Sequence, residues 1–179
     1  LLCDDGLQHL ALGRDIAIAV FDDRGTGNGW LLPAGLLREP WPPAAEDPFS
    51  PQFVLLQRRA DSAPVSHPAL PVGATLFVAT RRLAGVARGP SGSERPLSEL
   101  AGQDLVAVAG IARPEVFFEM LRDQGLTLSR CVALPDHAPP DAYQAVLDSP
   151  SSTVVCTEKD AVKLFAQALA LPADRRPSL

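Results

Sequence analysis

The sequence has little cysteine, and its cysteines are not spaced for a disulfide framework or a metal centre. The 179 residues contain three, Cys3, Cys131 and Cys156, without a CxxC pair. An odd number with such spacing supports neither a set of disulfides nor a zinc site. Each cysteine lies in an apolar, strand-like run, so we expect three buried and unreactive thiols.

Positive charge is also scarce. The formal net charge is -5, and only two of the 16 basic residues are lysines, Lys159 and Lys163. A nucleic-acid-binding domain normally carries a basic surface, so we expect no nucleic-acid partner. Nothing in the sequence indicates an oligomeric state.

Two further features are missing from these 179 residues. No window approaches the roughly 18 consecutive apolar residues that a membrane-spanning helix needs. The GxxxxGK[ST] loop that holds nucleotide phosphates does not occur, and neither lysine follows a glycine-rich segment. From its residues alone, the chain would carry half of a phosphoryl-transfer site without its phosphate loop.

The strongest chemical signal is a pair of carboxylates close to the first residue. An apolar run, residues 1–3, leads into Asp4 and Asp5, and Gln8 and His9 follow after a glycine. Paired aspartates at the end of a strand often hold Mg²⁺, because hard cations prefer oxygen ligands. The alternatives remain open: the aspartates could cap a helix, and His9 could be a structural imidazole.

The first half of the chain predicts short buried strands separated by long loops. Continuous apolar runs at 16–21 and 53–57 are typical of strands buried on both faces. The segment 24–40 is rich in glycine and proline and too long for a simple connector, so we expect a functional loop. We interpret 41–52 as surface chain, and we expect 75–80 and 84–87 to pair as a two-stranded linker.

The second half predicts alternating strands and helices. Strands are expected at 105–109, 128–134 and 153–157, and each is followed by a helix, at Pro114 to a Gly125 cap, at 139–147 and at 158–169. This alternation predicts parallel pairing with right-handed crossovers. The expected domains are 1–72, a β linker at 73–90, and a smaller α/β domain at 91–179.

Polar residues follow the predicted strands, where an open parallel sheet binds ligands. The clusters are Asp4-Asp5 with Gln8 and His9, Asp22-Asp23, Arg113, Asp136-His137, and Glu158-Lys159-Asp160. Simpler roles compete with ligand binding. Turn formation is favoured for Asp22-Asp23, a capped helix start is possible for Glu158-Lys159-Asp160, and His137 could be either an orienting cap or a general base.

Taken together, the motifs resemble the tetraacyldisaccharide 4'-kinase family of lipid A biosynthesis. The matching blocks occur in the family's order and cover nearly the whole chain from residue 3 to about 165. They are DDGLQH at 4–9, RD at 14–15, GNGWLLPAG at 27–35, REP at 38–40, AGIARP at 109–114 with FF at 117–118, PDH at 135–137 and TEKDAVK at 157–163.

The resemblance implies an α/β fold: the remainder of a P-loop NTPase-like α/β/α unit, a small β linker and a second, smaller parallel α/β/α unit. It implies ATP and Mg²⁺ as cofactors. Asp4 and Asp5 resemble a Walker B pair, and Asp4, Asp5, Gln8 and Glu39 are implied metal ligands, some acting through water. Asp5 also has an implied catalytic role.

The implied nucleotide-binding residues are Gln8, His9 and Arg113, and His137 is similar to the histidine that helps to activate the sugar hydroxyl. The implied substrate is the lipid A disaccharide 1-phosphate precursor. The implied location is the cytoplasmic face of the bacterial inner membrane, contacted through an N-terminal region that these residues do not include.

The family's Walker A loop and its catalytic aspartate precede the Walker B strand, and neither is in this sequence. We therefore expect a C-terminal portion of the kinase that is inactive alone. Two alternatives are a free-standing nucleotide- or Mg²⁺-binding module and a small α/β phosphatase that uses Asp4-Asp5 and His137.

Overall fold

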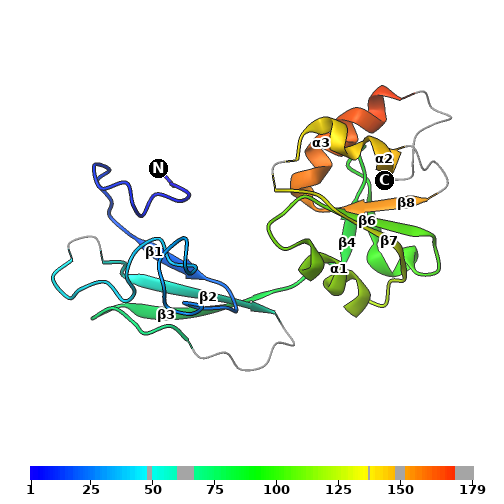
Figure 1. Cartoon of the computed structure of the whole chain (residues 1–179). Helices are drawn as coiled ribbons and strands as arrows, with labels where there is room; N and C mark the ends of the chain where they lie inside the picture. Colours follow the sequence, from blue (N-terminus) through cyan, green and yellow to red (C-terminus); the bar gives the residue numbers. More distant parts are fainter. Residues whose placement is uncertain (48–49, 60–66, 137, 148–151, 172–179) are drawn as a thin grey trace. The chain divides into compact units, whose positions relative to one another are not determined.

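The computed structural model describes residues 1–47, 50–59, 67–136, 138–147 and 152–171. The chain divides into two compact units, Leu1–Arg82 and Leu83–Leu179 (Figure 1). The division falls within the segment 73–90 that the sequence analysis assigned to a linker.

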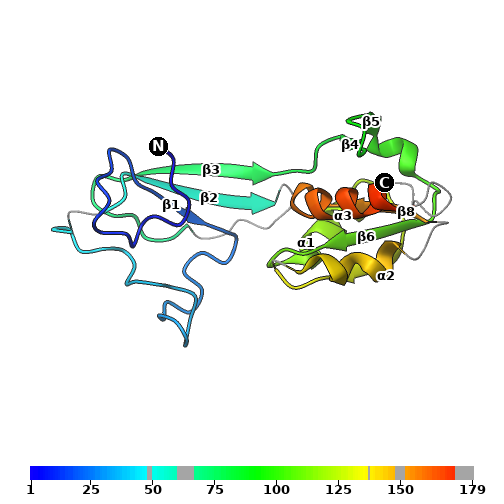
Figure 2. The ribbon, with the colours of Figure 1, turned by 90° about the horizontal axis from the view of Figure 1, so that it is seen from above.

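The first unit is built on a three-stranded parallel sheet. Its strands are β1 (Ile18–Phe21), β2 (Phe53–Arg59) and β3 (Thr75–Arg81), in the order β1-β2-β3. Figure 2 shows β2 and β3 running side by side in the same direction. The expected strands at 16–21, 53–57 and 75–80 are therefore present, with small shifts at their ends.

The two faces of this sheet differ in burial. On one face Ala19, Val54 and Leu56 are buried. On the other face Ile18, Val20 and Phe77 stay 52%, 57% and 53% exposed. Side chains alternate across a strand, so the apolar runs that predicted burial on both faces are buried on only one.

The predicted two-stranded linker is wrong in its pairing. Strand β3 pairs with β2, whereas β4 (Val86–Arg88) pairs antiparallel with β5 (Glu94–Pro96), which leads into a 3₁₀ turn, η1 (Leu97–Leu100). Local turn chemistry accounts for the β4–β5 hairpin. The Gly89 N–H donates to the Ser93 carbonyl at 2.8 Å, and Gly92 takes the positive φ (+80°) that closes the hairpin.

The second unit has the predicted alternation of strands and helices. Its parallel strands are β6 (Leu105–Ala109), β7 (Leu128–Ala133) and β8 (Thr153–Cys156), in the order β7-β6-β8. The helices are α1 (Pro114–Asp123), α2 (Gln144–Leu147) and α3 (Glu158–Ala170). The second expected helix is short because a 3₁₀ turn, η2 (Pro140–Tyr143), occupies its first half.

Both faces of the second sheet are covered. Every residue of β6 is buried, and its side chains alternate between two clusters. Leu105 packs in the cluster that contains Phe117 and Leu121 of α1, and Val108 packs in the cluster that contains Val146 of α2 and Leu164 of α3. Figure 1 shows the corresponding layers, with α1 on one side of the sheet and α2 and α3 on the other.

Two expectations about burial are wrong. Leu1 and Leu2 are almost fully exposed and belong to no strand, because residues 1–10 form turns. Cys3 and Cys131 are exposed and Cys156 is only partly buried. Cys3 lies in the turn region and Cys131 on the edge strand β7, so an apolar neighbourhood in the sequence did not give burial.

In the described part of the chain, no helix is both long and apolar enough to cross a membrane.

Candidate functional site

The structure brings two distant motifs of the first unit together. The Gln8 Nε2 donates to the Glu39 Oε1 at 3.2 Å, and the Arg38 guanidinium lies 3.4 Å from the Asp5 Oδ2. These pairs are separated by 31 and 33 residues in the sequence. Four predicted site residues, Asp4, Asp5, Gln8 and Glu39, thus belong to two segments in direct contact.

Backbone contacts hold the first of these segments. The Arg14 side chain donates to the Leu7 carbonyl (2.9 Å) and to the His9 carbonyl (3.1 Å). Asp5 has a left-handed backbone with φ of +53°, which aspartate tolerates better than most residues. No helix begins at Asp4-Asp5, so the structure does not support the capping role considered as an alternative.

The second segment follows a loop that folds on itself. The Asn28 side chain donates to the Ala34 carbonyl at 2.9 Å and accepts from the Trp30 N–H at 3.1 Å. A Cβ added at Gly35 would lie 2.2 Å from the Trp30 carbonyl oxygen, so this close approach requires glycine. The glycine- and proline-rich loop is thus an ordered support that leads directly to Arg38 and Glu39.

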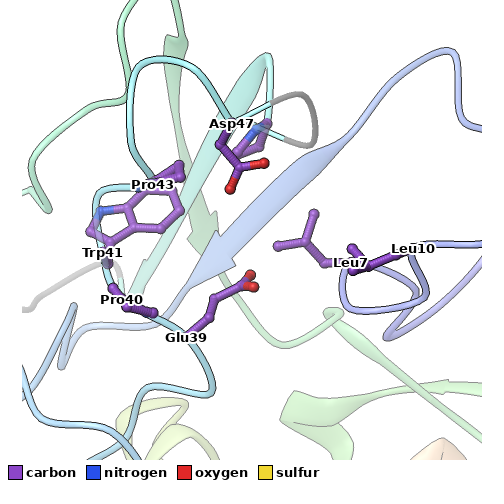
Figure 3. Close-up of a pocket in the computed structure, with 8 residues that line it drawn as sticks. Leu7, Leu10, Glu39, Pro40, Trp41, Pro43 and Asp47 are labelled. Atoms are coloured by element: carbon purple, nitrogen blue, oxygen red, sulfur yellow. The ribbon is translucent and has the colours of Figure 1, made fainter.

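A hollow of about 200 Å³ lies between these segments. Figure 3 shows the carboxylates of Asp47 and Glu39 pointing into it from above and below, with Leu7 and Leu10 to one side. Trp41 also lines it, with its ring edge-on to Phe21 at 4.7 Å between centroids.

Trp41 and Asp47 were not among the predicted site residues, because the segment 41–52 was interpreted as surface chain. The indole Nε1 of Trp41 donates to the Ala69 carbonyl at 2.7 Å, and Pro51 is buried. A tryptophan among prolines was the available signal, since a large aromatic side chain usually packs against a core.

The residues of this site fit Mg²⁺ in their donor chemistry, but they do not form a closed cage. Gln8 and Glu39 lie together and present oxygen atoms, which Mg²⁺ prefers. Among the described residues, however, no three acidic, histidine or cysteine side chains converge to hold a metal. Mg²⁺ keeps several waters and takes few protein ligands when it is bound to nucleotide phosphates, so a partial set is compatible with it.

Asp22 forms a turn, which is the simpler of the two roles considered for it, the other being ligand binding. Its Oδ1 accepts from the Arg24 N–H at 2.9 Å, and its carbonyl accepts from the Gly25 N–H at 3.0 Å. These contacts confirm the turn that the sequence analysis favoured at Asp22-Asp23.

The predicted residues of the second unit lie where its strands end. Arg113 follows β6 and is the N-cap residue of α1, with its Nε 3.6 Å from the Glu115 Oε1. Asp136 follows β7. His137, the predicted general base, lies outside the described residues, and its role stays a prediction.

A buried carboxylate organises this edge of the second sheet. Asp160 is 1% exposed and accepts from the Gly110 N–H (2.9 Å), the Tyr143 hydroxyl (2.5 Å) and the Thr157 hydroxyl (2.6 Å). Three donors satisfy a charge that would otherwise be costly to bury. A Cβ at Gly110 would lie 2.7 Å from the Asp160 Oδ1, so the network requires glycine there.

The same carboxylate affects its neighbours. Burial and the hydrogen bond to Asp160 raise the pKa of Tyr143 well above its usual value, which keeps the phenol protonated as a donor. Burial, together with the charge of Asp160, raises the pKa of the Cys156 thiol to about 12. Thr157 accepts from the Asp160 N–H, which confirms the capped helix start considered for Glu158-Lys159-Asp160.

Two lysines of α3 contact the loop after β7. The Lys159 ammonium pairs with the Asp136 carboxylate, and the Lys163 Nζ donates to the Ala138 carbonyl at 2.6 Å. Further along the helix, the Gln167 side chain donates to the Pro140 carbonyl at 2.7 Å. Neither lysine was among the predicted site residues, although their spacing of four residues, which places both on one helix face, was an available signal.

Comparison with known proteins gives a consistent match. A family model described as tetraacyldisaccharide-1-P 4'-kinase matches residues 1–175. The tetraacyldisaccharide 4'-kinase of Polaromonas naphthalenivorans (strain CJ2) is 49% identical over 185 residues, covering 99% of this chain and 50% of that protein. The corresponding protein of Verminephrobacter eiseniae (strain EF01-2) is 49% identical over 175 residues, covering 96% and 37%.

A solved structure is also similar. It is the crystal structure of LpxK from Aquifex aeolicus in complex with ATP, with a TM-score of 0.63 and 25% identity over 90% of this chain and 47% of that one. The likeness agrees with the expected α/β fold. The chain spans about half the length of the curated relatives that it matches. The match of the family model to residues 1–175 shows that this chain belongs to the tetraacyldisaccharide-1-P 4'-kinase family.

Proposed function

We propose that this chain serves in the ATP-dependent phosphorylation of the 4'-hydroxyl of tetraacyldisaccharide 1-phosphate, as part of a lipid A 4'-kinase. The observation that carries the proposal is the family match over residues 1–175. The ATP complex of the similar Aquifex aeolicus protein supports the choice of nucleotide. Nothing comparable supports the phosphatase or the free-standing binding module.

In this proposal the first unit serves the nucleotide and its metal. Asp4, Asp5, Gln8 and Glu39 contribute ligands to Mg²⁺, directly or through water, and His9 contacts the nucleotide together with Gln8. The contact between Gln8 and Glu39 supports a common role for the two segments. When bound, Mg²⁺ neutralises charge on the phosphate oxygens during transfer. The Arg38 guanidinium, 3.4 Å from the Asp5 Oδ2, helps to orient that carboxylate.

The second unit serves the sugar hydroxyl. His137 accepts the proton of the 4'-hydroxyl as the oxygen attacks the γ-phosphate, a role for which imidazole has a suitable pKa. Arg113 contributes positive charge toward the nucleotide. Arg113 and Asp136 follow neighbouring strands, and the carboxyl ends of parallel strands are the usual place for a ligand.

The substrate determines the proposed location. A disaccharide with several acyl chains stays in a membrane, so the enzyme must work at a membrane surface. We place it at the cytoplasmic face of the bacterial inner membrane, where ATP is available, with membrane contact made by chain outside the present residues.

The test is transfer of ³²P from ATP to the disaccharide 1-phosphate by the chain extended to the full length of its relatives. We expect Asp5→Ala and His137→Ala each to lower kcat by about 10²- to 10⁴-fold, the usual contribution of a positioned acid–base group. Val162→Ala, a substitution at an exposed residue of α3, is the control and should leave the rate unchanged. A wild-type rate in either variant would remove that residue from the site.

A further inference from the structure

The TEKDAVK stretch at 157–163 has no role in the proposed function. Its side chains nevertheless make several polar contacts with the loops that follow the strands of the second unit. Its Asp160 binds three donors from separate segments: Gly110 after β6, Tyr143 of η2 and Thr157 after β8. One buried carboxylate therefore fixes the ends of two neighbouring strands and the following turn relative to one another.

The two lysines extend these contacts to the third strand end. Lys159 pairs with Asp136, and Lys163 donates to the carbonyl of Ala138. Residues 136 and 138 are the immediate neighbours of position 137. The loop is also tied internally, because the Ala138 N–H donates to the Pro135 carbonyl at 3.0 Å. Both chain neighbours of the proposed base are thus held by the same helix.

The geometry argues against the alternative that these lysines bind the phosphates of ATP. The Lys163 Nζ makes a short, partly buried hydrogen bond to a backbone carbonyl at 2.6 Å, and Lys159 is paired with a carboxylate. A lysine that binds phosphate through its charge would leave its ammonium open to the nucleotide.

We propose that Lys159 and Lys163 are positioning residues that hold the loop after β7 on both sides of residue 137, while Asp160 anchors the start of their helix to the neighbouring strand ends. This inference rests on the proposed function, because it assigns the loop its purpose of presenting a general base. The two lysines act through position 137 and do not touch the reacting atoms. Displacing a catalytic base by about 1 Å can lower the reaction rate about 10²-fold, so holding the loop in place contributes to catalysis.

The test is steady-state kinetics of the full-length kinase, with ATP and the disaccharide 1-phosphate varied separately. We expect Lys163→Met to lower kcat about 10- to 100-fold with the KM for ATP unchanged within about twofold. Lys163→Arg keeps a donor and should recover most of the loss. Val162→Ala, on the same helix but exposed, should behave as wild type.

A double-mutant cycle shows whether Lys163 acts through residue 137. Once His137→Ala has removed the base, adding Lys163→Met should have no further effect on kcat, because coupled residues are not additive. Full additivity would overturn the proposal. So would a raised KM for ATP with an unchanged kcat, since that result would make Lys163 a nucleotide ligand.

Amide hydrogen exchange of the segment 134–147 provides a readout that does not depend on catalysis. We expect Lys163→Met to speed exchange at Ala138 and its neighbours at least about tenfold, with no change in Val162→Ala. Unchanged exchange would show that Lys163 does not hold the loop. If the wild-type protein transfers no phosphate, the proposed function fails, and the exchange result alone decides whether α3 anchors this loop.

Discussion

The two units bury their parallel sheets to different extents. In the second unit, β6 is completely buried, and the helices α1 and α3 cover opposite faces. In the first unit, Ile18, Val20 and Phe77 lie on one sheet face, and each is more than half exposed. The second unit therefore has a complete core of its own, whereas the first has an apolar face that its own described residues do not cover.

This difference separates the two proposed roles. The second unit can hold a rigid loop at its sheet edge because its strands are fixed by packing on both sides and by the Asp160 network. The first unit presents its site residues, Gln8 and Glu39 among them, from turns and a loop. Covering the open apolar face should therefore affect the order of the first unit's site more than that of the second unit's site.

The largest expected effect comes from separating the units. Residues 83–179 should fold alone and unfold cooperatively, since a complete hydrophobic core is enough for a small domain. Residues 1–82 should bind the dye ANS and give poorly dispersed NMR amide signals, because their apolar face is open. Cooperative unfolding of residues 1–82 without dye binding would contradict the claim that the first unit has an uncovered apolar face.

Matched truncations of one side chain in each sheet should differ in cost. Leu105 of β6 is fully buried, so Leu105→Ala should lower the free energy of unfolding by about 2–5 kcal/mol. Ile18 of β1 is 52% exposed, so Ile18→Ala in the 179-residue chain should cost less than about 1 kcal/mol. Urea denaturation of both variants measures this. Equal costs would show that the open face is packed in solution.

The cysteines give the smallest effect. Exposed Cys3 and Cys131 should react readily with a thiol reagent at pH 8, whereas Cys156, with its pKa raised to about 12, should react only after unfolding. Counting labelled thiols by mass spectrometry checks this. Three thiols labelled at equal rates in the native protein would contradict it.

The same thiol predicts a pH dependence of stability. Its folded pKa of about 12 lies above the ordinary value of 9.0, so folding favours the protonated form. Its contribution to stability is present below about pH 9 and is lost as the pH rises from 9 to 12. Cys156→Ala should remove that part of the alkaline loss in a pH series of urea denaturations.

The second unit was the easier to predict from the sequence. A strand at 105–109, a helix with Pro114 at its first turn and Gly125 beyond its end, and parallel pairing all agree with the structure. These signals are local and mutually consistent, so tertiary contacts did not override them. The domain boundaries and the roles of the site residues stay predictions.

The errors came from features that depend on partners distant in the sequence. An apolar run does not say whether one or both of its faces are covered, so β1 and the three cysteines were assigned too much burial. Strand pairing of 75–81 depends on β2, about 20 residues earlier, which local turn chemistry cannot reveal. The Asp160 network joins segments up to 50 residues apart, and only the fold brings them together.

The most direct test of the account is the position of phosphate transfer. The chain extended to the full length of its relatives, given Mg²⁺, γ-labelled ATP and tetraacyldisaccharide 1-phosphate, should place one labelled phosphate on the 4'-hydroxyl. The 179 residues alone should place none, because they lack a phosphate-binding loop. Transfer by the 179 residues alone, or no transfer by the extended chain, would contradict the account.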